Sequence, residues 1–121
     1  MPKEYLHKAQ CEHNREFYNE PIFNGDKYND WRVVVMFYEA VHLVEAYFAA
    51  HGNLHCASHE NRRNAIRGDA EIREIYAPYD DLYSTANLGR YHCATIGTRQ
   101  VCVCQTDLDV IRKKLVPLMA K

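Results

Sequence analysis

The sequence contains few of the residues that usually separate domains. Its 121 residues include four prolines and five glycines, and no low-complexity or Pro/Gly/Ser-rich stretch divides them. A chain of this length without a linker predicts one domain, spanning residues 1–121. Apolar residues make up 47% of the composition, which is ordinary for a globular protein with a buried core.

An excess of charge of one sign is also lacking. The formal net charge is −1, from 15 basic and 16 acidic side chains. This balance gives no overall field that would steer nucleic acid or a membrane surface toward the protein. Binding to nucleic acid would therefore need a local basic patch.

Features of export and of membrane insertion are scarce as well. The first 17 residues contain no apolar signal core, and the five cysteines are odd in number. We therefore expect a cytoplasmic protein with free thiols. The apolar run 33–50 is interrupted by Glu39, His42 and Glu45, each costly at the centre of a bilayer, so we expect no membrane association.

Several motifs that bind ligands are absent from the chain. It has no GxxxxGK[ST], GxGxxG or GxSxG, which disfavours phosphate-loop hydrolysis, the usual dinucleotide binding and nucleophile-elbow hydrolysis. Four side chains that could bind zinc lie close together in the sequence: His51, His55, Cys56 and His59. Gly52-Asn53 is expected to break any helix that would bring them onto one face. We predict no metal and no cofactor, with a structural zinc site as the alternative.

What the chain does contain is helical periodicity. Apolar residues recur at three-to-four spacing, and caps and stops divide them into about five helices. We expect helices over residues 3–20, 31–50 (capped by Asp30), 58–67 (capped by Ser58), 69–88 (capped by Asp69) and from the cap Thr106 onward, with 93–105 irregular or briefly extended. This order predicts an all-α bundle.

The segment 31–50 is the most informative of these. It is apolar almost all round, so we place it at the centre of the bundle. His42 and Glu45 interrupt that apolar surface, and a histidine there can exchange protons near neutral pH. His42 is therefore our candidate catalytic residue. The alternative is a core histidine that is hydrogen-bonded to a carboxylate or to Tyr38.

A second group of residues suggests phosphate or base recognition. Arg62 and Arg63 lie beside His59 at the start of a predicted helix, and arginine forks match phosphate oxygens. Tyr91 could stack on a base, and Arg90 beside it could add a second wall. The alternatives are a solvated basic face paired with nearby glutamates and a tyrosine that anchors a helix end. The predicted nucleotide- or RNA-binding residues are Tyr38, His59, Arg62, Arg63, Arg90 and Tyr91.

The order of these pieces resembles a known family. It runs Trp31, FYEAVHLVEAYFA (37–49), His59-x-x-Arg62 with Ile66, Tyr79-x-x-Leu82-x-Ser84 and Asn87-Leu88-Gly89-Arg90-Tyr91. Over about residues 30–92 the chain resembles the small bacterial and archaeal HEPN-like proteins (higher eukaryote and prokaryote nucleotide-binding). The resemblance implies a compact helical bundle that often dimerises and that associates with nucleotides or RNA.

Active members of that family are metal-independent ribonucleases with an Arg-x4–6-His motif, and here the chain departs from the pattern. The position upstream of His42 that would match is Val35 or Met36. We therefore predict a HEPN-like domain that binds a nucleotide, RNA or a protein partner without catalysis. The alternatives are a toxin-like ribonuclease using His42 or His59, with a toxin–antitoxin partner protein, and a structural protein-interaction module.

Assembly is the first testable prediction. Small helical domains gain buried core by pairing, and twofold dimers are the commonest closed form. We expect a homodimer at micromolar concentration. Sedimentation analysis that shows only the 14.2 kDa single chain would contradict this.

Overall fold

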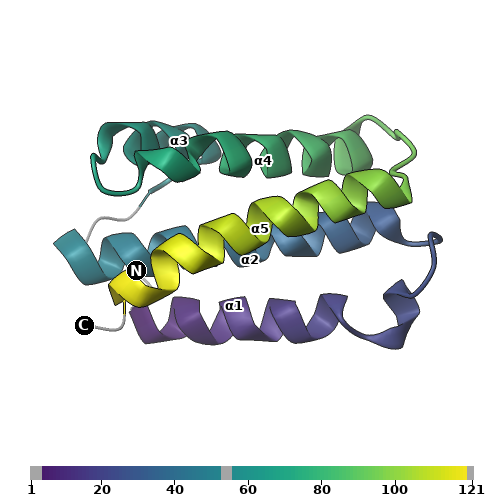
Figure 1. Ribbon diagram of the computed structural model, residues 1–121, viewed down its shortest axis with the longest axis horizontal. Helices are drawn as coiled ribbons and strands as arrows, with labels where there is room; N and C mark the ends of the chain where they lie inside the picture. The colour runs from purple at the N-terminus through teal and green to yellow at the C-terminus, as the bar shows by residue number, and fades with distance from the viewer. Residues whose placement is uncertain (1–3, 53–55, 120–121) are drawn as a thin grey trace.

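The computed structural model describes residues 4–52 and 56–119, and this part of the chain is built from helices, with no strand (Figure 1). The predicted all-α bundle is therefore confirmed. The described residues form the α-helices α1 (Glu4–Tyr18), α2 (Asn29–Gly52), α3 (His59–Gly68), α4 (Tyr76–Tyr91) and α5 (Thr98–Met119), with 3-10 turns at Pro21–Phe23 and Arg73–Ile75.

Helix α2 lies at the centre of the bundle, as its composition predicts. It packs against α1 on one side, against α4 on the other and against α5, which runs across it in Figure 1. Because α2 contacts three helices, most of its circumference is buried, including Val33, Val34, Met36 and Glu39, which point in different directions from the helix axis. This burial explains why the segment has no polar stripe.

The same helix is long and apolar enough to cross a membrane by length and composition. Within the bundle, 72% of its apolar window is buried, as in the core helix of a soluble protein. The absence of membrane association stays a prediction.

Some boundaries follow the sequence signals closely. Ser58 caps α3 as predicted, because its hydroxyl oxygen accepts a hydrogen bond from the Asn61 backbone N–H at 3.1 Å. Helix α3 then ends at Gly68. Pro21 opens a 3-10 turn directly after α1, which ends at Tyr18.

The predicted helix over 69–88 is wrong in its first part. Asp69 does not cap a helix: one carboxylate oxygen accepts from the Glu71 backbone N–H at 2.9 Å and the other from the Tyr47 hydroxyl at 3.0 Å. A 3-10 turn follows, and α4 begins at Tyr76. Pro78 then falls in the first turn of α4, where its missing N–H costs no helical hydrogen bond.

The irregular segment expected over 93–105 is also wrong beyond its first residues. Helix α5 begins at Thr98, where the Gln100 side chain accepts from the Gly97 backbone N–H at 2.9 Å. Thr106 is not a cap, since it lies inside α5 and donates its hydroxyl to the Cys102 carbonyl at 3.1 Å. The helix extends this far because Val101 and Cys104 continue its buried stripe.

A glycine sets the distance between two helix ends near the cleft described below. A Cβ on Gly89 would lie 3.2 Å from Asp30 Cβ and 3.3 Å from Ile96 Cγ1. A larger residue would therefore make a tight contact here, and its neighbours would have to shift by a few tenths of an ångström. Asn29 holds the following loop to the same place, because its amide donates to the Ile96 carbonyl at 3.0 Å.

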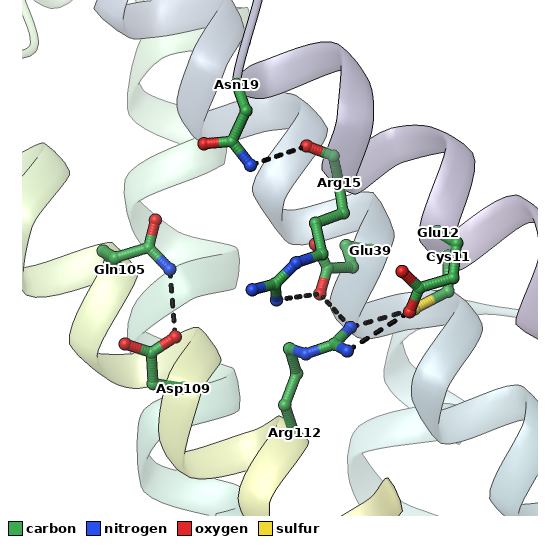
Figure 2. Close-up of polar contacts among 8 residues, drawn as sticks. All are labelled: Cys11, Glu12, Arg15, Asn19, Glu39, Gln105, Asp109 and Arg112. Carbon is green, nitrogen blue, oxygen red and sulfur yellow. Dashed lines mark hydrogen bonds and ion pairs between the residues drawn. The ribbon is translucent and has the colours of Figure 1, made fainter.

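A buried ion pair connects α2 to the two helices that cover it (Figure 2). Glu39 of α2 is 0% exposed, and Arg112 of α5 donates to it at 2.8 Å. Arg112 also donates to Glu12 of α1 at 3.2 Å and contacts the Cys11 sulfur at 3.5 Å. Burial raises the pKa of the Glu39 carboxyl, while Arg112 opposes that shift. The charge of Glu39 therefore depends on Arg112 and, at 4.0 Å, on Arg15 of α1.

We expect Arg112→Met to lower the free energy of unfolding by about 3 kcal/mol, because the buried Glu39 carboxylate loses its hydrogen-bonded cation and keeps only Arg15, which lies 4.0 Å away. The matched control is Lys114→Met, also on α5, which removes the surface pair between Lys114 and Glu74 at 2.6 Å. Exposed pairs contribute only about 0–1 kcal/mol. Urea denaturation measures both variants, and equal losses would contradict the role of the Glu39 pair.

Candidate functional site

A cleft of about 370 Å³ lies where α2, α3 and α4 meet. Four of the six predicted binding residues line it: Tyr38 from α2, His59 from α3, and Arg90 and Tyr91 from the end of α4. Its volume falls in the range of sites for small molecules. Residues that are distant in the sequence therefore share one concave surface.

Aromatic rings form much of the cleft wall. Phe37 is buried, and its ring centroid lies 5.4 Å from those of Tyr38, His59 and Tyr83. Phe37 and Tyr83 are lining residues that sequence reasoning missed. The only sequence signal for Tyr83 is its place in the predicted helix over 69–88, which does not distinguish a cleft residue from a core residue.

Arg90 supplies positive charge at the exposed rim of the cleft. Its guanidinium donates to the Tyr38 hydroxyl at 2.7 Å and lies 4.9 Å from the centre of the Tyr91 ring. Among the residues that the structure describes, Arg90 has no carboxylate partner. Its charge is therefore positioned by two tyrosines and is available to an anion.

Arg62, our first choice for a phosphate contact, lies elsewhere. It is 7% exposed, and its Nε donates to Glu45 Oε1 at 2.9 Å. Its Nη1 donates to His59 Nδ1 at 3.0 Å. Arg62 thus lies behind His59 with its charge compensated, because the side chain is buried against Glu45 of α2.

Arg63 is not a lining residue either. It donates to Asp80 of α4 at 3.1 Å and lies over the Tyr83 ring at 4.5 Å. The glutamates that we considered as partners of the basic face play no part in this pair, and Glu74 pairs with Lys114. Arg63 therefore joins α3 to α4 behind the cleft wall.

His42, our candidate catalytic residue, does not line the cleft. Its Nδ1 is 2.8 Å from Nδ1 of His7 on α1, so one ring donates a hydrogen bond and the other accepts it. Burial, then His7 and Arg62, lower the pKa of His42 to about 4. His42 is thus a neutral histidine between α1 and α2, partnered by a histidine and not by the carboxylate or the Tyr38 that we considered.

His59 is a predicted binding residue that also lines the cleft. Burial lowers its pKa, and Arg62, Arg63 and Arg90 lower it further. A neutral imidazole is therefore favoured at neutral pH, and its hydrogen-bonding capacity matters more than its charge.

Metal ligands do not gather in the part of the chain that the structure describes. Residues 4–52 and 56–119 contain no group of three or more His, Cys, Asp or Glu side chains that could hold a metal ion. His55 lies outside the described residues. His51 bonds to the Leu118 carbonyl at 2.8 Å, and all five cysteines are free thiols.

Comparison with known proteins gave no relative: no family model, no curated protein and no solved structure matches this chain. The HEPN-like resemblance stays a prediction from the residues quoted for it.

The lowered pKa of His42 generates a test of its environment. Between about pH 6.5 and 4 the unfolded chain binds a proton on His42 that the folded protein does not, so stability falls as the pH falls. We expect His42→Gln, which cannot titrate, to remove about 2 kcal/mol of this pH-dependent loss.

Denaturation at pH 7, 5.5 and 4.5 measures the effect against wild type. The control is His13→Gln, which changes an exposed histidine on α1 and should preserve the wild-type profile. Parallel profiles for wild type and His42→Gln would show that His42 titrates alike in both states.

Proposed function

We propose that the cleft between α2, α3 and α4 binds a nucleotide or a segment of single-stranded RNA without cleaving it. The observation that carries the proposal is Arg90, a rim guanidinium without a carboxylate partner in the described structure, beside a cleft lined by aromatic rings. Single-strand binders combine these same two features, cationic groups for the backbone and ring faces for the bases.

The two halves of such a ligand match different parts of the cleft. Tyr91 is 63% exposed, so its ring is accessible for stacking on a base. Arginine binds phosphate oxygens through paired N–H donors, and Arg90 uses Nη1 on Tyr38 while its remaining donors have no partner in the described structure. Base and phosphate would therefore be held within one side-chain length of each other.

The histidines support binding over cleavage. A general base works best with a pKa near the operating pH, and the pKa values of both His42 and His59 are lowered. His42 bonds to His7 away from the cleft lining, and His59 already accepts a hydrogen bond from Arg62. The ribonuclease alternative is thus the weaker one.

The test is fluorescence anisotropy with a labelled single-stranded RNA over a range of salt concentrations. Arg90→Ala should weaken binding about tenfold and reduce the salt slope by about 0.7–1, because one phosphate contact is lost. Tyr91→Ala should weaken binding by about 1–3 kcal/mol through lost stacking while leaving the salt slope unchanged.

The control is Arg67→Ala, which changes an arginine on α3 that stacks 4.9 Å from the Tyr76 ring outside the cleft. It should bind RNA like wild type. Undetectable or salt-insensitive binding by wild type would refute the proposal and favour a protein-interaction module. Metal-independent RNA cleavage that is lost in His59→Ala or His42→Ala would favour the ribonuclease.

A further inference from the structure

The two ring nitrogens of His59 have different surroundings. Nδ1 accepts a hydrogen bond from Arg62 Nη1 at 3.0 Å. Arg62 is always protonated and has no lone pair to offer, so Nδ1 can only act as the acceptor in this contact. Neutral His59 must therefore carry its proton on Nε2.

Arg62 is itself fixed in this orientation. Its Nε donates to Glu45 Oε1 at 2.9 Å, and both side chains are buried. A buried pair of this kind is costly to break, because either charge alone would be left in the core. The tautomer of His59 is therefore set by a pair that spans α2 and α3.

His59 lines the cleft, and its Nε2 lies on a different edge of the ring from the Nδ1 that faces Arg62. Nε2 has no hydrogen-bond partner among the described residues. The rings of Phe37 and Tyr83 lie 5.4 Å from the His59 ring, and that of Tyr38 lies 6.4 Å from it. An N–H donor is thus presented between aromatic walls.

Burial of the His59 ring, and then the charges around it, keep this donor neutral. Protonation of Nδ1 would replace the bond from Arg62 with a repulsion between two cations. The other charged groups that bear on His59 are Arg63, which pairs with Asp80, and Arg90, while Glu45 is paired with Arg62. The neighbours on α2 and α4, Phe37, Tyr38 and Tyr83, are uncharged rings.

We propose that His59 is the residue that selects the base: its Nε2–H donates to O4 of uracil or O6 of hypoxanthine, so the cleft prefers keto bases to amino bases. This inference rests on the proposed nucleotide binding. Uracil and hypoxanthine present a carbonyl where cytosine and adenine present an amino group. If the Nε2–H of His59 faces an amino group, both groups are donors and neither finds an acceptor. An unpaired polar group in a partly closed site lowers the binding affinity.

The base edge is the better match for His59 than a phosphate. Ring faces carry negative electrostatic potential, which disfavours an anion between Phe37, Tyr38 and Tyr83. Arg90 lies at the exposed rim and is the cation available to a phosphate. A mononucleotide would thus place its base against His59 and its phosphate beside Arg90.

The experiment compares the affinities of uridine, cytidine, inosine and adenosine monophosphates at pH 7 by calorimetry. Wild type should bind the uridine and inosine nucleotides about tenfold more tightly than their amino counterparts. His59→Phe keeps a ring but loses the donor, so this variant should bind keto and amino nucleotides with about equal affinity. His13→Phe, which changes an exposed residue of α1, is the control and should keep the wild-type preference.

A second measurement requires no variant. Nitrogen-15 chemical shifts of wild-type His59 at pH 7 should report a neutral ring protonated on Nε2. A ring protonated on Nδ1, or on both nitrogens, would overturn the assigned donor.

The outcomes separate this inference from the proposed function. Equal affinities for keto and amino nucleotides, still weakened by Arg90→Ala, would overturn base selection by His59 and leave nucleotide binding intact. No binding of any of the four nucleotides to folded wild type would overturn both. A keto preference that persists in folded His59→Phe would assign the selection to another residue and overturn the inference.

Discussion

The arrangement of this bundle depends on neutralising two carboxylates inside its central helix. Glu39 and Glu45 both lie on α2 and are buried, and each is paired with an arginine from another helix. Arg112 comes from α5 and Arg62 from α3. Because an unpaired charge in the core would cost several kcal/mol, each pair favours one register of its helix against α2. Apolar contacts alone would tolerate a shift more easily.

The pairing of Glu45 with Arg62 has a chemical consequence at the surface. Arg62 is occupied by the carboxylate, so it contributes no free charge to the cleft and instead fixes the hydrogen-bonding state of His59. The available charge is Arg90, held by Tyr38 at the rim. A polar interaction in the core thus decides which groups the cleft presents to a ligand, and favours a site that recognises over one that transfers protons.

The fold was largely predictable from local patterns, whereas the site was only partly so. The all-round apolar character of α2 and the Ser58 cap are local signals, and both predicted the structure correctly. The start of α5 was missed because cysteine, glycine and threonine over 93–105 obscured its buried stripe. Long-range pairs were not predictable: His42 meets a partner 35 residues away, and Arg112 meets Glu39 across 73 residues. Periodicity predicts which face of a helix is buried, but not which residues of the other helices contact that face.

The central claim is that the cleft beside Tyr38, His59, Arg90 and Tyr91 is the ligand site. Its most direct test is a nuclear magnetic resonance titration of the protein with a short single-stranded RNA. A ligand in this cleft should produce shift changes that centre on those four residues and leave unaffected His42, which contacts His7 of α1, and Glu39, which pairs with Arg112 of α5. Changes that centre on His7 and His42, or no changes at millimolar ligand, would contradict it.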